Sequence, residues 1–160
     1  MAEPTMRELP SAISTVIMAG DFPHCNPEAL FAYWTRPELL CRWWPHEAET
    51  DPRLGGTYHL AWPAMNWHLR GRYIAIAPGR RLAFTWAWDH EPDAPERQVD
   101  ITFAPGVEGD TRLTITHGPY GDSDAERASR AGNIEGWQHF CAKLTALLDE
   151  DGEDVAAWSR

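Results

Sequence analysis

The sequence is short of positive charge. Its 160 residues include 14 Lys and Arg against 24 Asp and Glu, which gives a formal net charge of −10. Proteins that follow nucleic-acid phosphates or bind anionic membrane surfaces need a basic face. The charge balance therefore argues against nucleic acid as a partner and against an anionic membrane surface.

Long apolar runs and cysteines are also scarce. No run approaches the ~20 residues of a membrane-spanning helix, and the first ten residues, MAEPTMRELP, lack a secretory hydrophobic segment. Cys25, Cys41 and Cys141 are odd in number and widely spaced, which favours a reducing compartment over a disulfide framework. We therefore expect a cytoplasmic protein without integral membrane association.

No internal repeat and no Gly/Ser-rich or Pro-rich linker divides the chain, whose length suits one domain. Hydrophobic residues make up 43% of the sequence and nine residues are tryptophan, which is too apolar a composition for a disordered protein. We predict a flexible N-terminal tail over residues 1–10, a single domain over residues 11–148 and an acidic C-terminal tail over residues 149–160.

The apolar pattern of this domain changes along the chain from strand to helices, then to many strands and a last helix. Residues 11–22, rich in β-branched side chains, predict a first strand. Two short helices follow, one started by Asn26 and Pro27 and the next by Pro37. Over residues 47–117 apolar and polar side chains alternate between turn signals, which predicts an antiparallel sheet with one buried face.

A long amphipathic helix ends the domain. Ser123 and Glu126 have the spacing of a capping box, and apolar residues then recur every three or four positions. Gly132 and Gly136 interrupt this pattern at a cost of about 1 kcal/mol each relative to Ala. We expect a compensation for this cost, either close packing of the helix on the sheet or a break in the helix before Trp137.

The sequence contains few residue patterns typical of catalytic or metal sites. The seven histidines never fall at i, i+4 on a predicted helix and no Cys-x-x-Cys pair occurs, so we predict neither a metal nor a cofactor. His24 and Cys25 are adjacent, and adjacent side chains point apart, which disfavours a Cys–His nucleophile. Gly55 and Gly56 precede a strand rather than a helix, which argues against a phosphate-binding loop.

Five motifs carry a resemblance to a known family. They read LLCRWWP from Leu39, LGGTY from Leu54, GRYIAIAPGRRLAFTW from Gly71, GDTRLTITH from Gly109 and EGW from Glu135. In these motifs the chain is similar to bacterial-type relatives of the activator of heat-shock-protein-90 ATPase, within the START lipid-transfer-like (SRPBCC) superfamily. The similarity runs over residues 13–148. It implies an α+β helix-grip fold, in which a curved antiparallel β-sheet wraps around a long C-terminal helix and two short helices follow strand 1.

The resemblance also implies a cavity between the sheet and the C-terminal helix. Residues 66–76 leave two alternatives open, because either the odd-numbered residues Trp67 to Tyr73 or the even-numbered residues His68 to Ile74 face it. The Gly-x-Tyr pattern of the family favours the first. The candidate cavity residues are Tyr58, Leu60, Trp62, Tyr73, Phe84, Trp86, Trp88, Ile101, Phe103, Ile115, His117, Trp137, Phe140 and Leu144. Of these we place His117 and Tyr58 near the mouth as polar anchors.

These residues suggest three classes of function. The first is a binding protein for a small hydrophobic, aromatic or lipid-like molecule, because ligand sites are mostly apolar with few polar groups. The alternative is an enzyme of polyketide cyclase/aromatase or related type, with His117, Tyr58 or His59 as acid or base, although spacing forces no such pair together. A chaperone-ATPase-activator-like stress protein, with a chaperone partner, is the third. The resemblance ties that activity to an additional domain outside these 160 residues.

Aromatic residues also suggest a partner of the protein. Trp43, Trp44 and Trp67 flank the predicted helices, and we expect them to form an exposed apolar surface. Exposed apolar patches often become interfaces between subunits. We therefore predict a homodimer.

Overall fold

The structure is a computed structural model that describes residues 5–158, with side chains described up to residue 151. Its elements follow in the order β1 (Met6–Glu8), β2 (Val16–Phe22), α1 (Pro27–Thr35), α2 (Pro37–Leu40), β3 (Glu47–Thr50), β4 (Thr57–Trp62), η1 (Pro63–Met65), β5 (Trp67–Ala77), β6 (Arg81–Trp88), β7 (Arg97–Pro105), η2 (Val107–Gly109), β8 (Thr111–Gly118) and α3 (Asp124–Trp158). The strands and the long last helix are those that the sequence pattern predicts, with the exceptions given below.

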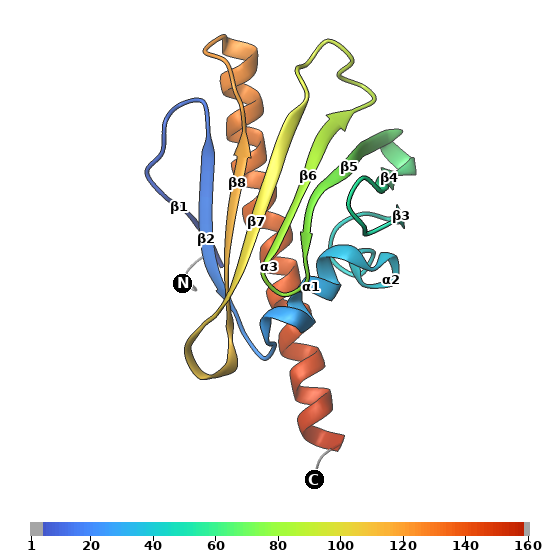
Figure 1. Cartoon of the computed structure of the whole chain (residues 1–160), viewed down its shortest axis with the longest axis vertical. Helices are drawn as coiled ribbons and strands as arrows, with labels where there is room; N and C mark the ends of the chain where they lie inside the picture. Colours follow the sequence, from blue (N-terminus) through green and yellow to red (C-terminus); the bar gives the residue numbers. More distant parts are fainter. Residues whose placement is uncertain (1–4, 159–160) are drawn as a thin grey trace.

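The eight strands form one antiparallel sheet in the order β1-β2-β8-β7-β6-β5-β4-β3. The sheet curves, and α3 lies along one of its faces (Figure 1). α1 contacts α3 through Trp34, whose ring centroid lies 5.8 Å from that of Trp137. The predicted α+β architecture, a curved antiparallel sheet against a long C-terminal helix, is confirmed.

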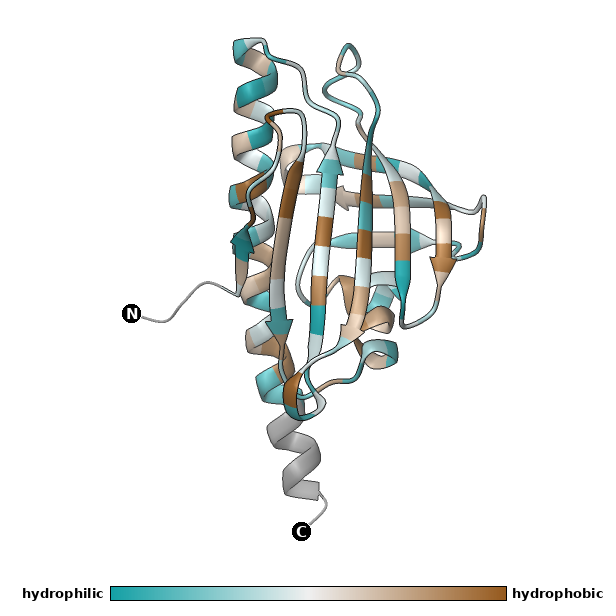
Figure 2. Cartoon of the chain, turned by 60° about the vertical axis from the view of Figure 1, so that its left-hand side comes forward, coloured by the Kyte–Doolittle hydropathy of each residue, from teal (hydrophilic) through white to brown (hydrophobic). Residues whose placement is uncertain are grey.

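The alternation of apolar and polar residues along the strands has the predicted phase, and it is visible as alternating bands of colour in Figure 2. In β5, Leu69 and Tyr73 are buried whereas Arg70 and Arg72 are exposed, so the first of the two alternatives is correct. A register shift between Tyr73 and Ala75 bends the end of this strand. β4, β5 and β6 therefore present their aromatic side chains to the face that α3 covers.

The expectation of a loose N-terminal tail is wrong for β1. Met6 pairs with Gly20 of β2, and its side chain is fully buried. A Cβ atom on Gly20 would collide with the Thr5 carbonyl oxygen and lie 2.8 Å from the Met6 sulfur, so the missing side chain of Gly20 lets the backbone at the start of β1 and the Met6 side chain approach β2. The strand predicted as the first is therefore the second, and it begins at Val16 rather than at residue 11. A strand of three residues is too short to show a period, and residues 1–4 lie outside the described part.

The expectation of an acidic tail from residue 149 is also wrong, because α3 continues to Trp158. The Ser123 hydroxyl accepts a hydrogen bond from the Glu126 N–H (3.1 Å), as the capping box predicts. The Glu126 side chain departs from the capping box, because its carboxylate accepts from the Gly121 N–H and pairs with Arg97 (2.5 Å). Near the other end, Asp151 forms an ion pair with Arg42. Residues 159–160 of the predicted tail lie outside the described part.

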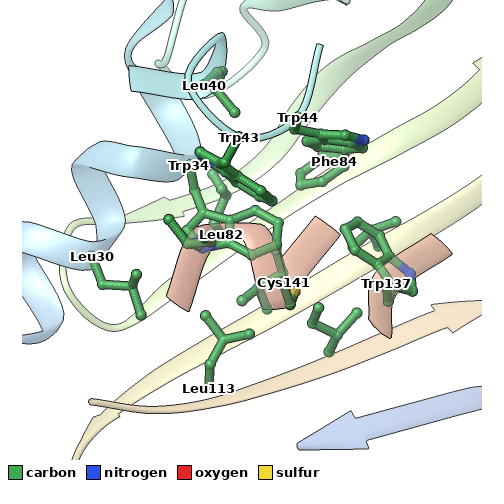
Figure 3. Packing of buried hydrophobic residues seen from close by; sticks show 14 of the residues in the cluster. Leu30, Trp34, Leu40, Trp43, Trp44, Leu82, Phe84, Leu113, Trp137 and Cys141 are labelled. Carbon is green, nitrogen blue, oxygen red and sulfur yellow. The ribbon is translucent and has the colours of Figure 1, made fainter. Parts of the chain in front are cut away.

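The core lies between α3 and the sheet and extends under α1 and α2. Figure 3 shows Trp34, Trp43 and Trp44 gathered beside α3, from which Trp137 and Cys141 project. Trp43 is 1% exposed and Trp44 is 7% exposed. The expected aromatic surface for a homodimer is therefore wrong for these two residues, because both fold inward, Trp44 onto Trp137 of α3 and Trp43 onto Trp34 of α1. Trp67 alone of the three is exposed.

Candidate functional site

A cavity of about 420 Å³ lies between the first half of α3, the segment after α2, and the ends of β4, β5 and β6. Seven of the nine tryptophans of the chain line it. The lining residues are Cys41, Arg42, Trp43, Trp44, Pro45, His46, Trp62, Met65, Trp67, Trp86, Trp88, Gly132, Asn133, Gly136, Trp137, Phe140 and Lys143.

The tryptophans come from three directions. Trp62 ends β4 and Trp86 lies in β6, so the sheet supplies one wall. Trp43 and Trp44 follow α2, where the chain turns back before Pro45 and carries both indoles inward. Trp137 projects from α3. The cavity therefore depends on the packing of sheet, α2 segment and α3 on one another.

The indole rings hold one another in fixed orientations. Trp44 and Trp86 stack with their centroids 6.0 Å apart and an interplanar angle of 23°. Trp137 contacts both rings, at 5.3 Å from Trp44 and 5.6 Å from Trp86. The Trp43 indole N–H donates to the Tyr33 carbonyl (3.0 Å), which fixes that ring as well. The cavity wall is thus a preformed set of flat π surfaces.

The helical wall of the cavity is bare where Gly132 and Gly136 lie. A Cβ atom at either position would meet nothing within 4 Å. The helix runs through both glycines without a break, and neither packs closely on the sheet, so both expected compensations are wrong. The two glycines, one helical turn apart, leave space that belongs to the cavity.

An ionic cluster ties the second half of α3 to α1 and to the segment after α2. The Arg42 guanidinium makes two hydrogen bonds to the Asp151 carboxylate (3.1 and 3.2 Å). The Tyr33 hydroxyl donates to the same carboxylate. Burial, and then the hydrogen bond to Asp151, raise the pKa of Tyr33 to about 12. The charge of Arg42, which lines the cavity, is therefore already balanced.

The candidate cavity residues fall into three groups. Those that line the large cavity are Trp62, Trp86, Trp88, Trp137 and Phe140. A separate hollow of about 10 Å³, too small for a ligand, is lined in part by Tyr58, Leu60, Tyr73 and Phe84. The remaining residues line neither space and are packed in the core: Ile101, Phe103, Ile115, His117 and Leu144.

His117 does not lie at a mouth. It is fully buried, and its Nδ1 accepts a hydrogen bond from the Trp137 indole N–H (3.0 Å). Its Nε2 has no hydrogen-bond partner within the described residues. Burial, and then the charge of Arg97, lower the pKa of His117 to about 3. The imidazole is therefore neutral and serves to orient the Trp137 ring of the cavity wall.

The other two acid–base candidates also lie away from the cavity. The Tyr58 hydroxyl is buried and donates to the Thr85 carbonyl, and burial raises its pKa well above the ordinary value. Tyr58 is therefore not at a mouth either. His59 lies in β4 on the opposite parity, with its Nε2 2.8 Å from Nδ1 of His68. His117 therefore shares no site with the other two, whereas Tyr58 and His59 both line a separate hollow away from the tryptophan-lined cavity.

The buried His117 should make the protein sensitive to mild acid. Below its ordinary pKa of 6.5 the unfolded state binds a proton, whereas the folded state stays neutral down to about pH 3. The free energy of unfolding should therefore fall as the pH falls from 6.5, by about 2 kcal/mol at pH 5. Urea unfolding at pH 7.5 and pH 5 measures this loss. In His117→Gln, whose amide oxygen can still accept from Trp137, this part of the decline should vanish, and an equal decline in both proteins would contradict the assignment.

Sequence reasoning missed several residues of the cavity. Met65 lies beside the exposed Trp67 at its edge, Asn133 lies on α3, and Lys143 lies nearly three turns further along that helix. Periodicity could not find these residues because they are polar or lie in a turn. Gly132 and Gly136 did carry a signal, because glycine inside a helix needs a reason.

A smaller cavity of about 170 Å³ adjoins the first. The two share Trp86, Trp88, Gly132 and Asn133, so only these side chains and the bare helix separate them. The second cavity is more polar, and Arg97, which pairs with Glu126, contributes to its lining.

Within residues 5–158 none of the helices combines the length and apolar character that crossing a bilayer requires. In the same part of the chain, no three His, Cys, Asp or Glu side chains come together as metal ligands would. All three cysteines are free thiols.

Comparisons with known proteins address the family. No curated protein matches the sequence. A protein of Mesorhizobium loti has a similar structure with 25% sequence identity and a TM-score of 0.74, covering 85% of this chain and 97% of that chain. A Rhodobacter sphaeroides protein shares 23% identity with a TM-score of 0.75, covering 91% and 99%. An Hsp90 activator from Plasmodium falciparum shares 22% identity with a TM-score of 0.69, covering 85% and 96%.

The family model described as Activator of Hsp90 ATPase homolog 1-like protein matches residues 24–149. This match spans α1 to most of α3 and contains every residue that lines the large cavity. The predicted resemblance is thereby confirmed, and the chain belongs to the Activator of Hsp90 ATPase homolog 1-like family.

Proposed function

We propose that the protein binds a small, flat, apolar molecule in the tryptophan-lined cavity. The observation that carries this proposal is the concentration of seven of the nine tryptophans around one cavity of about 420 Å³. A core that only needed filling would have used these rings to close the space. Ligand sites typically have volumes of about 300–1,000 Å³ and mostly apolar walls.

Burial of the ligand supplies most of the affinity in this proposal. Each Å² of apolar surface removed from water contributes roughly 25 cal/mol. The rings are already held by stacking and by the Trp43 and Trp137 hydrogen bonds, so little side-chain entropy is lost on binding. Free thiols at all three cysteines fit the cytoplasmic location that we propose for this activity.

Binding has more support than catalysis. A general acid or base must reach the proton that it transfers, but His117 and Tyr58 are committed to partners in the core and His59 lies on the outer face. A role in chaperone activation is suggested by similarity to the Hsp90 activator of Plasmodium falciparum. At 22% identity this similarity supports a shared fold but not a shared activity. A homodimer loses most of its rationale, because Trp43 and Trp44 are buried.

Titration with planar aromatic compounds tests the proposal. Two-ring and three-ring aromatics should quench the tryptophan fluorescence with one saturating site, because most of the indoles line one cavity. Trp67→Ala, at the exposed edge of the cavity, should weaken binding about threefold or more without loss of fold. Leu54→Ala serves as the matched control, since Leu54 is exposed but lies outside the cavity lining. Absence of saturable quenching by every compound in the wild type would overturn the proposal.

A further inference from the structure

Lys143 is the one lysine in the 160-residue sequence, in which the other 13 of the 14 basic residues are arginines. It lies on α3 and lines the large cavity. Its ammonium group lies 5.7 Å from the centroid of Phe140, which also lines that cavity. Among the described residues, no carboxylate forms an ion pair with it.

The charges around the cavity are of one sign. Arg42 and Lys143 are the charged side chains among its described lining residues, and none of those residues is Asp or Glu. This contrasts with a chain in which acids outnumber bases by 24 to 14. Arg42 is balanced by Asp151, so within the part of the chain that the structure describes Lys143 is the cavity cation without a counter-charge.

The position of Lys143 fixes which end of the cavity is cationic. Along α3 the lining residues run from Gly132 through Gly136 and Phe140 to Lys143. At 1.5 Å per residue this stripe is roughly 16 Å long. The bare glycine surface lies at one end and the ammonium group at the other.

We propose that the ligand of this cavity is a flat aromatic acid. Its rings lie between the tryptophans and the glycine surface of α3, and its carboxylate pairs with the Lys143 ammonium. The proposal rests on the proposed function and adds the charge and the direction of the ligand. Rings and carboxylate lie in one plane in such an acid, which suits a space between indole faces and the bare glycine surface with a cation at its end.

A matched pair of probes tests this inference. Naphthalene-2-carboxylate and naphthalene-2-methanol have the same ring system and differ in charge. Isothermal titration calorimetry at pH 7.5 should give the wild type a threefold to tenfold preference for the carboxylate. Lys143→Gln should abolish the preference and leave the affinity for the alcohol within about twofold. Lys143→Arg should retain it.

Arg127→Gln is the control for net charge, because Arg127 is exposed on the same helix and lies outside the cavity lining. It should keep the wild-type preference. If both probes bind equally well to the wild type, or if Lys143→Gln keeps the preference, the inference is overturned while the proposed function stands. If neither probe binds and no other aromatic does, the proposed function itself fails.

Chemical labelling gives a second readout of the same contact. An acetylating ester modifies lysine amines, and mass spectrometry can follow the single lysine directly. Saturation with naphthalene-2-carboxylate should slow the acetylation of Lys143 at least threefold relative to saturation with the alcohol. Equal rates at equal occupancy would contradict an ion pair between ligand and Lys143.

Discussion

Replacing Trp86 with alanine should lower the free energy of unfolding by about 3–5 kcal/mol. Trp86 is 7% exposed and contacts rings on both sides, with Trp44 stacked on it and His117 at 4.6 Å. Its loss joins a new void to an existing cavity, so the neighbouring rings lose contacts that no other side chain can replace. Urea unfolding followed by far-ultraviolet circular dichroism measures the effect independently of tryptophan fluorescence.

Trp67→Ala supplies the control, because the same side chain is removed from a site that is 41% exposed. Its cost should stay below about 1 kcal/mol. A loss of less than 1 kcal/mol in Trp86→Ala as well would mean that the tryptophan cluster does not stabilise the fold. The preformed cavity wall would then have no structural basis.

Filling the helical wall of the cavity should abolish binding. In Gly136→Leu the new side chain enters space in which a Cβ meets nothing within 4 Å, so the backbone need not shift. The side chain then occupies part of the volume that a ring system needs. We expect affinity for planar aromatics to fall at least tenfold in a fluorescence titration. Ala142→Leu adds the same side chain on an exposed position of α3 outside the cavity and should bind as the wild type does.

The same position separates stability from binding. Glycine inside a helix costs about 1 kcal/mol relative to Ala, so Gly136→Ala should raise the free energy of unfolding by about that amount. If Gly136 leaves room for the ligand, the more stable Gly136→Ala variant should bind large aromatics more weakly than the wild type. A variant that gains stability and binds equally well would show that the bare helix surface has no part in binding.

Much of the fold follows from local patterns in the sequence. The large apolar side chains of Leu82, Phe84 and Trp86 alternate with smaller ones and identify the face toward α3, although Ala83 and Thr85 on the other face are buried too. The cap formed by Asn26 identifies a helix start. Both signals depend on neighbours in the chain. The strand β1 could not be predicted in this way. Its position depends on Gly20 of another strand, and no local period records that partnership.

The site was less predictable than the fold. Parity identifies which side chains face inward, but it does not say which of them meet a packed neighbour and which meet open space. Leu144 and Trp137 share a helix face, yet the first is sealed in the core and the second lines the cavity. That difference arises from the placement of Trp43 and Trp44 after α2, which depends on tertiary packing and not on local sequence. The cavity is therefore displaced toward the beginning of α3.

The pairing of β2 with β8 has a consequence for the order in which the protein folds. β3 to β8 form a meander of neighbouring strands. β2, in contrast, pairs with β8, which is synthesised much later, so this pairing cannot form until β8 has been made. α3 is made later still, and until it docks only α1 and α2 cover part of the apolar face of the sheet (Figure 1). Non-local pairing of this kind slows folding and leaves apolar surface open to aggregation. The nascent chain is thus most vulnerable just before α3 leaves the ribosome, with its tryptophan-rich wall bare to the solvent.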